Sequence, residues 1–440
     1  MKILIYTPKV SNRLQYVFRL IFKEILRVEV EFTKNLEEFK LAEGVKISYA
    51  QKPVDEGLYF GAHSLLFEKG IKEQNITCFD WDETKAFFKT PALLQERGQG
   101  EVPFDPFAAS FYLVSRYEEY LPHRKDIHGR FPPEEGLAFQ NSFLQKPVVN
   151  IWAQKIKEII QKKHSSFQFP VSSFQFIPTI DVDSAFAYKE KGWVRTAGAY
   201  ARSLIEMNLA EISERTKVLL GQQPDPFDTF DYLIDLQEKY RFKPIYFFLV
   251  ADYGLNDKNV PHTSKKFRSL IKHVGDYADV GTHPSYGSNE KPTKLKTEIS
   301  RLRNALHKDI TKSRQHFLKL NMPQTYRQLL ENDITEDYTM GYASELGFRA
   351  SICTPFNFYD LDLEAETKLK VHPFCLMEAT LKYYKNTPPA ESMQHFKPVI
   401  DAVKTVNGTL YTVWHNEFLS EKNEFKGWKS VFEEIVEYVS

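Results

Sequence analysis

The sequence predicts an α/β fold in two parts, and three observations lead to this prediction. Stretches that alternate apolar and polar residues recur along the 440 residues, separated by stretches with the apolar period of helices. Strand–helix units of this length are typical of a parallel sheet or barrel with crossover helices. A polar, serine-rich joint at residues 164–175, interrupted by Pro170, predicts a boundary between domains at 1–165 and 176–440.

The first part contains short expected strands and amphipathic helices. Strands are expected at residues 2–7, 28–33, 46–51 and 76–81, and helices at residues 13–26, 106–121 and 148–163. A polar loop at residues 122–136 contains His123 and His128, which we interpret as solvated loop residues. This order of elements predicts a smaller α/β domain.

The second part repeats the strand–helix unit more regularly. Strands are expected from residue 174 to the acidic residues at 181–183, and at 243–252, 278–283, 311–318, 348–354 and 409–418; helices are expected at 227–240, 264–277, 293–307 and 323–332. An inserted helical stretch, residues 194–220, suits a lid, a dimer face or, more simply, packing on the domain surface. Functional residues of such folds gather at the carboxyl ends of the strands.

Bulk composition argues against several functional classes. The 58 Lys and Arg residues balance the 58 Asp and Glu residues, so no net charge draws the chain to nucleic acid or an anionic membrane. No window approaches the ~20 apolar residues of a membrane span. The N-terminus lacks an apolar run of signal-peptide length, and three scattered cysteines imply no disulfide framework, which together favour a cytoplasmic location. Motifs of serine hydrolases, nucleotide hydrolases and zinc proteases are absent from the sequence.

Two aspartates end the first strand of the second part. Asp181 and Asp183 stand two residues apart after an apolar run, so both carboxylates of an extended chain face the same side. Close carboxylates repel each other unless a cation or a proton lies between them. The pair therefore suits a metal ligand beside a general base. Capping of the following helix would explain one aspartate of the pair.

Histidines lie at three other strand ends of the same part. His283 and His415 each end an apolar strand, whereas Arg314 and His316 share one face of a third strand. A single strand-end histidine is often a hydrogen-bonded structural residue, but three of them with an aspartate pair indicate one site. Imidazoles and a carboxylate bind divalent transition metals, which predicts zinc, with cobalt or nickel as alternatives.

At this point the chain resembles a known family. The stretches TIDVD, THPSY, SRQHF, DYTMGYASELGFRAS and YTVWH follow one another in this order. They make residues 176–440 similar to the polysaccharide deacetylase superfamily, the carbohydrate esterases that remove acetyl groups from N-acetylated sugars. The resemblance implies a distorted (β/α) barrel, usually of fewer than eight strands. Residues 1–165, with FYLVSRYEEYL and HGRF, resemble an additional N-terminal domain of uncharacterised function found in one branch.

The resemblance also implies a role for each motif residue. Asp181 would be the general base that activates the attacking water, and His415 the general acid that protonates the leaving amine. Arg314 would pair with the base and keep it ionised. Asp183 and His283 would be metal ligands. These roles amount to metal-assisted hydrolysis.

One position departs from the family pattern. The second motif of the family has another histidine four residues after the first, where this chain has Gly287. His316 stands near a position that is proline in the third motif of the family, so we expect it to replace the missing ligand, with His372 as a weaker candidate. If no residue replaces it, the site is degenerate and binds sugar without cutting it.

Three further residues are assigned to substrate binding. Tyr286 and Trp414 are suited to stacking on a sugar ring, although an aromatic beside a strand-end histidine usually packs in the core or at its rim. Asp337 would help to orient the arginine and the base, or belong to a turn. The predicted function is metal-dependent removal of acetyl groups from an N-acetylated, or less favourably O-acetylated, sugar or polysaccharide precursor. Two alternatives stay open: a glycan-binding or polysaccharide-assembly protein on a deacetylase scaffold, and cleavage of a glycosidic bond by paired carboxylates.

Overall fold

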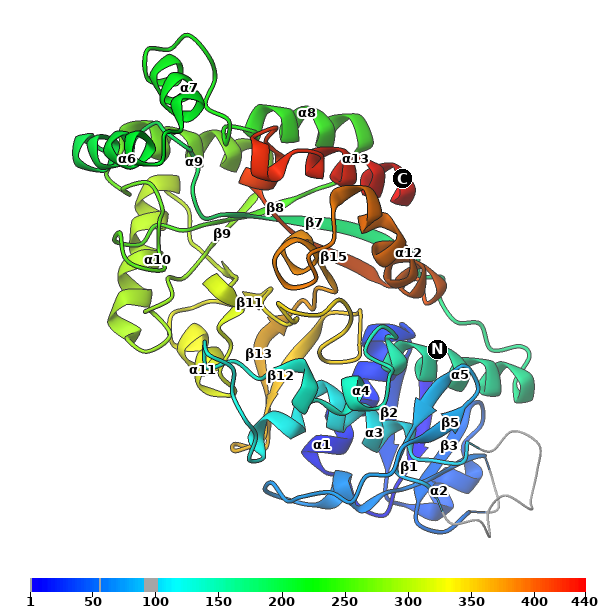
Figure 1. The fold of residues 1–440 in the computed structure, drawn as a ribbon. Helices are drawn as coiled ribbons and strands as arrows, with labels where there is room; N and C mark the ends of the chain where they lie inside the picture. The colour runs from blue at the N-terminus through cyan, green and yellow to red at the C-terminus, as the bar shows by residue number, and fades with distance from the viewer. Residues whose placement is uncertain (1, 55–56, 91–101) are drawn as a thin grey trace.

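Two sheets organise the chain (Figure 1), whose computed structural model describes residues 2–54, 57–90 and 102–440. The smaller sheet lies in the N-terminal part, and its four strands are all parallel in the order β2–β1–β3–β4. These strands are β1 (Lys2–Tyr6), β2 (Glu29–Thr33), β3 (Lys46–Ala50) and β4 (Leu58–Gly61). A separate antiparallel pair follows, β5 (Phe79–Trp81) and β6 (Thr84–Ala86).

Capped helices pack together beside the smaller sheet. Ser11 begins α1 (Asn12–Phe18) by accepting the N–H of Leu14, and the helix continues as a π-helical segment, Arg19–Ile25. Asp105 begins α3 (Pro106–Val114) in the same way, with proline in the first turn. The rings of Phe18 on α1 and Phe107 on α3 stack with their centroids 4.0 Å apart. The other helices of this part are α2 (Leu36–Leu41), α4 (Leu137–Gln140) and α5 (Val148–Lys163).

The larger sheet has nine strands in the order β12–β13–β11–β10–β9–β8–β7–β15–β14. Every neighbouring pair in it is parallel except β12 and β13, which form an antiparallel hairpin. The strands are β7 (Gln175–Val182), β8 (Ile245–Phe248), β9 (Asp279–Thr282), β10 (Lys312–Ser313), β11 (Glu336–Asp337), β12 (Phe356–Asp360), β13 (Ala365–Val371), β14 (Leu376–Met377) and β15 (Thr409–His415).

The α/β class with a mainly parallel sheet is confirmed, whereas this sheet is open and the distorted barrel implied by the resemblance is not confirmed. Among the described residues no pairing joins β12 to β14 at the two edges. Residues 348–354, expected as a strand, form turns instead. Their backbone groups bond to the N-terminal part: Phe348 N–H donates to the Leu144 carbonyl, and the Ser351 carbonyl accepts the Val149 N–H. With those groups engaged the segment cannot pair as a strand, and the β12–β13 hairpin forms that edge.

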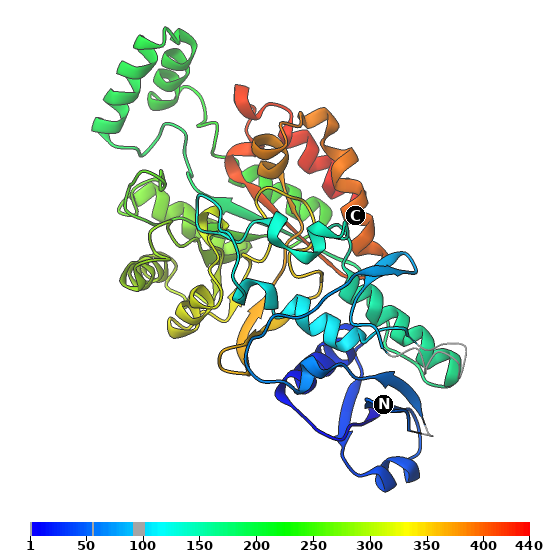
Figure 2. The same cartoon turned by 60° about the horizontal axis from the view of Figure 1, so that its bottom comes forward.

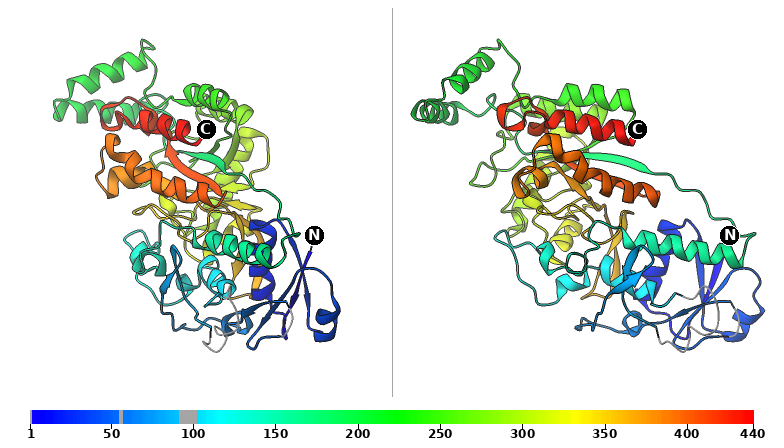
Figure 3. Two further views of the ribbon diagram at one scale, coloured as in Figure 1. Left: turned by 90° about the vertical axis from the view of Figure 1, so that its right-hand side faces the viewer. Right: turned by 45° about the vertical axis from the view of Figure 1, so that its right-hand side comes forward.

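The second part contains eight α-helices among the described residues, and most of them connect or cover these strands. They are α6 (Trp193–Ile205), α7 (Leu209–Leu219), α8 (Phe230–Tyr240), α9 (Lys265–Tyr277), α10 (Pro292–Leu306), α11 (Gln324–Glu331), α12 (Pro389–Thr405) and α13 (Trp428–Val439). The hairpin of α6 and α7 projects away from the rest of the chain (Figures 2 and 3). Within the described ranges, no helix combines the length and apolarity that crossing a membrane requires.

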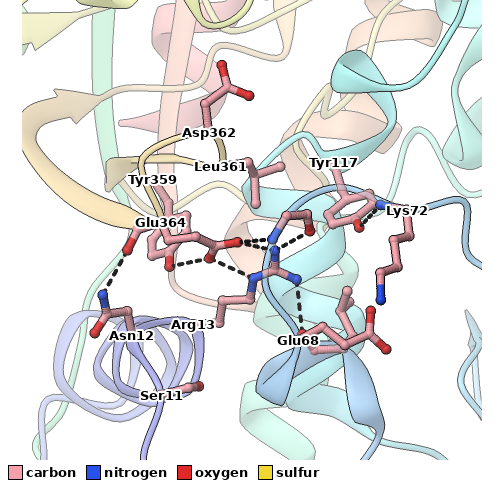
Figure 4. Close-up of polar contacts among 12 residues, drawn as sticks. Ser11, Asn12, Arg13, Glu68, Lys72, Tyr117, Tyr359, Leu361, Asp362 and Glu364 are labelled. Carbon is pink, nitrogen blue, oxygen red and sulfur yellow. Dashed lines mark hydrogen bonds and ion pairs between the residues drawn. The ribbon is translucent and has the colours of Figure 1, made fainter.

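Buried ion pairs join the two parts of the chain. Arg13 of α1 is almost fully buried and forms an ion pair with Glu364 in the β12–β13 turn (Figure 4). Glu119 accepts from both Arg116 and Arg349, which brings the two parts together at a second place. The N-terminal part therefore packs against the hairpin edge of the larger sheet.

Candidate active site

The register of the larger sheet brings the motif residues together. His415 at the end of β15 lies opposite Asp181 at the end of β7. On the other side of β7, the strands β8, β9 and β10 end near the same level, so His283 and Arg314 follow directly after β9 and β10. Residues far apart in sequence thus meet at the carboxyl ends of neighbouring parallel strands, as expected for this class of fold.

A carboxylate and two imidazoles converge at this edge. Asp183 Oδ1 lies 3.2 Å from His283 Nε2, and Asp183 Oδ2 lies 3.3 Å from His316 Nε2. One ligand atom from each of the three residues lies within 4.8 Å of the others, a spacing that could hold a metal ion. His316, rather than a residue of the Gly287 turn, is therefore the third member of this group.

The hydrogen bonds at Nδ1 of His283 and His316 determine which ring nitrogen has a free lone pair. His283 Nδ1 lies 2.6 Å from the Arg314 carbonyl oxygen, which can only accept, so Nδ1 donates. His316 Nδ1 donates in the same way to Asp257 Oδ1, at 2.9 Å. In neutral imidazoles both Nε2 lone pairs then face Asp183. Such carboxylate and carbonyl partners are typical of metal-binding histidines.

The electrostatics of the cluster favour a positive charge at its centre. Burial lowers the pKa of His316, but the carboxylates of Asp183 and Asp257 outweigh burial and raise it to about 9. Burial raises the pKa of Asp183, but the two histidines outweigh burial and hold it well below its ordinary value. Asp183 Oδ1 and Asp181 Oδ1 are buried without a hydrogen-bond donor. A divalent cation would satisfy Asp183 Oδ1 and the two histidine lone pairs, so the residues present fit a metal.

Asp181 lies beside this cluster and is paired with a buried arginine. Its side chain is 3% exposed, and its Oδ1 lies 3.6 Å from Arg314 Nε. Arg314 is itself fully buried and donates from Nη2 to Thr179 Oγ1 at 2.6 Å. The arginine is thus held beside Asp181 by its hydrogen bond to β7.

His415 points into the same space from the neighbouring strand. Its Nε2 lies 3.9 Å from Asp183 Oδ2, and its Nδ1 lies 2.6 Å from Glu378 Oε1. Burial lowers the pKa of His415, but Glu378 outweighs burial and raises it to about 10. The imidazole therefore holds a proton that it can present at Nε2. Glu378 and Asp257 are functional candidates that sequence reasoning missed, since Glu378 follows a strand of only two residues and Asp257 lies in an irregular loop.

The cavity in front of these residues is lined by aromatic side chains and by one arginine of the N-terminal part. It has a volume of about 170 Å³, and its lining includes Phe317, Tyr384 and Arg130. Arg130 belongs to the polar loop at residues 122–136 and donates from Nη1 to the Phe317 carbonyl at 2.7 Å. This contribution of the N-terminal part was also missed, because the sequence gives no sign of which surface that loop covers.

Two residues assigned to substrate binding do not reach the cavity. Trp414 is 1% exposed and packs against Phe432 of α13, with ring centroids 5.0 Å apart. Neighbouring strand residues face opposite sides, so a strand that directs His415 into the cavity directs Trp414 into the core. Asp337 is fully buried and accepts hydrogen bonds from the N–H and hydroxyl of Thr339. Stacking of Trp414 on a sugar is corrected, because this side chain lies in the core. Asp337 does not line the cavity, and its role in orienting Arg314 stays a prediction.

The remaining candidates lie in separate places. Tyr286 packs against Phe317 and lies 3.3 Å from His128 Nδ1, beside the cavity but not among its lining residues, so its role in substrate binding stays a prediction. His372 lines a different cavity, where Tyr411 and Glu336 are its partners. It is therefore too far removed in the fold to serve as the replacement ligand.

Comparisons with known proteins found one family model and several solved structures. A model described as a family of unknown function, DUF7033, matches residues 3–165, and no curated protein matches the chain. A Mycobacterium smegmatis structure described as a polysaccharide deacetylase is 13% identical, with a TM-score of 0.39, over 62% of this chain and 87% of that one. A Bacillus cereus polysaccharide deacetylase is 11% identical, with a TM-score of 0.29, over 60% and 89%.

A third similar structure is a CE4 family pseudoenzyme from Bacillus anthracis. It is 9% identical, with a TM-score of 0.30, over 60% of this chain and 62% of that one. At such identities and TM-scores none of these likenesses carries an argument about activity. The functional case therefore rests on the contacts described above.

Proposed function

We propose that this protein is a metal-dependent hydrolase that removes the acetyl group from an N-acetylated sugar. The observation that carries the proposal is the convergence of Asp183 with two histidine lone pairs, from His283 and His316, beside a buried acid–base pair. Binding of a glycan alone requires neither the arginine-paired Asp181 nor the glutamate-paired His415. Their presence around one cavity supports hydrolysis.

The residues divide the chemistry between them. A divalent cation held by Asp183, His283 and His316 supplies a Lewis acid and lowers the pKa of water. Asp181, which is paired with Arg314, accepts a proton from the attacking water. His415 donates its Nε2 proton to the amine as the amide C–N bond breaks. The oxygen of the attacking water ends in the carboxyl group of the released acetic acid. Proton transfers by such positioned groups contribute roughly 10²- to 10⁴-fold each.

Aromatic side chains around the cavity support a carbohydrate as the substrate. Phe317, Tyr383, Tyr384 and Phe418 line it together with the charged residues. Aromatic faces bind the apolar faces of sugar rings, while a few placed polar groups orient them. A glycosidase would need two carboxyl groups on opposite sides of the scissile bond. Asp181 and Asp183 come from one strand end, which favours the deacetylase.

Release of acetate tests the proposal. The wild-type protein, supplied with zinc, cobalt or nickel, is expected to release acetate from N-acetylglucosamine oligosaccharides. Asp181→Asn is expected to lower kcat roughly 10²- to 10⁴-fold while metal content and glycan binding persist. Asp333→Asn is the matched control, because Asp333 is exposed and its φ of 60° suits asparagine. Failure of the metal-loaded wild type to release acetate, with glycan binding intact, would favour the non-catalytic alternative.

A further inference from the structure

A second cavity adjoins the proposed active site. It has a volume of about 410 Å³ and lies between the α6–α7 hairpin and residues 253–258. Glu417 lines both this cavity and the one that contains Asp183, and Ser184, the next residue after Asp183, lines the second cavity. A ligand in the second cavity would therefore lie next to the proposed catalytic groups. We call this space the cationic cavity.

Lys191 is a partly buried cation in this space, and among the described residues no carboxylate oxygen lies within ion-pair distance of it. Its ammonium donates to the Ser184 hydroxyl, and within the described ranges it forms no ion pair. The carboxylates of Asp225 and Glu417 interact with it at longer range, and the oxygens of Asp225 accept the N–H groups of Ala187, Tyr188, Lys189 and Phe227. Burial, with help from Arg195, lowers the pKa of Lys191 to about 8. An unpaired cation is costly to bury unless a ligand supplies the missing anion.

Three further cations line the cationic cavity, and one of them, Arg215, is already paired with Glu211. The other two are Arg195 and Lys258. Arg195 donates to the carbonyls of Lys258 and Asn259 and stacks on Tyr253, 4.0 Å from the ring centroid. Lys258 lies 5.2 Å from the same ring and is exposed. In the part of the chain that the structure describes, neither forms a salt bridge. Glu417 is the one carboxylate among the residues that line the cavity, so the lining has a positive excess.

We infer that the cationic cavity binds a phosphate or diphosphate group, so that the substrate of the proposed deacetylation is a phosphorylated N-acetyl sugar. A phosphate monoester has a charge near −2 and three acceptor oxygens, which matches three cations approaching from different segments. A neutral sugar would leave Lys191 unpaired. This inference rests on the proposed function for the reaction, whereas the anion site itself can be tested by binding alone.

Such a phosphate has two possible sources, a soluble nucleotide sugar and a lipid-linked sugar. The α6–α7 hairpin beside the cavity exposes large apolar side chains, among them Trp193 and Ile205, each 83% exposed, and Met207, 85% exposed. The hairpin projects outward from the body (Figure 2), where a lipid chain could contact it. The experiment therefore needs one substrate of each kind.

Pyrophosphate binding measured by calorimetry tests the anion site. The wild type is expected to bind pyrophosphate, and Lys191→Met and Lys258→Met are each expected to weaken binding roughly tenfold or more. Because Lys258 is exposed, its variant should fold even if loss of Lys191 perturbs folding. Lys217→Met is the matched control, an exposed lysine on α7 outside the cavity. Absence of binding, or equal binding by all four proteins, would overturn the inference.

Turnover tests the substrate class separately. Acetate release is compared for UDP-N-acetylglucosamine, polyprenyl-diphosphate-linked N-acetylglucosamine in vesicles, and N-acetylglucosamine oligosaccharides. A kcat/KM at least roughly tenfold higher for one phosphorylated substrate, with the preference reduced in Lys191→Met but kept in Lys217→Met, supports the inference and identifies the source. Equal kcat/KM for all three overturns it and leaves the proposed function intact. No acetate from any substrate refutes the proposed function, and pyrophosphate binding then decides the anion site.

Discussion

A single oxygen of Glu378 accepts two hydrogen bonds from His415. Glu378 Oε1 lies 2.6 Å from His415 Nδ1 and 2.7 Å from the backbone nitrogen of the same residue. The glutamate side chain is fully buried, so water does not compete for it. This arrangement fixes the plane of the imidazole and directs Nε2 into the cavity, which makes Glu378 a positioning residue for the proposed acid.

Replacement of Glu378 tests this role. Glu378→Gln keeps the shape of the side chain but removes its charge, so His415 is held less firmly as the protonated form. We expect kcat to fall roughly 10²- to 10⁴-fold with the metal content unchanged. Glu378→Asp should recover part of the activity. Glu345→Gln, which removes a carboxylate paired with Lys385 outside the cavity, should retain wild-type kcat. An unchanged kcat in Glu378→Gln would refute the role.

The proposed role of His316 as a metal ligand can be tested by measuring metal content. His316→Ala is expected to lower the zinc stoichiometry of the purified protein well below that of the wild type, because a third ligand is lost. His372→Ala is the matched control: His372 is also a buried histidine, but it lies in another cavity. Elemental analysis of both variants and the wild type measures the zinc bound per protein molecule. Equal metal content in the two variants would eliminate His316 as a ligand.

Replacement of Asp257, the hydrogen-bond partner of His316, should weaken metal binding less than loss of His316 itself. Asp257 accepts from His316 Nδ1 at 2.9 Å and thereby fixes the nitrogen that faces Asp183. Asp257→Asn keeps an oxygen at this position but removes the charge. Losses of such outer contacts typically weaken metal affinity about 10- to 100-fold. Competition with a chelator of known affinity measures the change, and an unaltered affinity would contradict the role assigned to Asp257.

Arg130 provides a test of how the N-terminal part contributes to activity. Its side chain lines the cavity and its Nη1 donates to the Phe317 carbonyl, beside the proposed ligand His316. Arg130→Ala should lower kcat/KM about tenfold or more, because one wall of the cavity and one charged hydrogen bond are lost. Arg124→Ala in the same loop is exposed and should behave as the wild type. Similar kinetics for the two variants would show that the loop does not shape the site.

The sequence was informative wherever local geometry alone decides the position of a side chain. Asp181 and Asp183 could be placed together because an extended chain repeats its direction every two residues. His283, Arg314 and His415 could be placed with them because parallel strands share one carboxyl edge. The same alternation would have excluded Trp414, which is adjacent to His415 and must face the opposite side.

Other features depend on contacts that no local pattern records. Glu378 follows a strand of two residues, and Asp257 lies in an irregular loop, so neither has a periodic context. Arg130 reaches the cavity only because the N-terminal part packs on the hairpin edge of the larger sheet. The expected strand at 348–354 reads as apolar and β-prone, but its backbone bonds to the N-terminal part instead. Tertiary packing overrides propensity at each of these places.

The lowered pKa of Glu336 predicts that part of the free energy of unfolding is lost at acid pH. Burial raises its pKa, but His372, Lys312 and Tyr338 outweigh burial and lower it from 4.5 to about 2. The unfolded chain therefore binds this proton at higher pH than the folded chain, so the stabilisation is complete above pH 4.5 and is lost as the pH falls toward 2. The Tm difference between wild type and Glu336→Gln should be largest at neutral pH and shrink below pH 4.5.

The exposed Glu331 provides the control for this titration. Glu331→Gln should change Tm little at any pH, because its carboxylate is on the surface of α11. Melting curves of the three proteins between pH 7 and about pH 3 give the comparison. A Tm difference for Glu336→Gln that stays constant with pH would contradict the lowered pKa.

The ion pair between Arg13 and Glu364 should contribute strongly to holding the two parts together. Arg13 Nε donates to Glu364 Oε2 at 2.9 Å, and the arginine side chain is only 1% exposed (Figure 4). Glu364→Gln keeps the shape and the backbone strain at φ 50° but leaves a buried guanidinium without its anion. Breaking a buried pair in this way typically costs about 3–5 kcal/mol. Urea unfolding should report a loss of this order.

An exposed ion pair of the same part gives the matched comparison. Lys23 and Glu29 are both more than half exposed, with an Nζ–Oε1 distance of 2.9 Å, so Glu29→Gln should cost about 0–1 kcal/mol. Unfolding followed by both tryptophan fluorescence and acetate release would show whether the cavity is lost together with the contact between the parts. Equal, small losses in the two variants would mean that apolar contacts, rather than this pair, hold the N-terminal part against the β12–β13 edge. The position of Arg130 in the cavity would then depend on those apolar contacts.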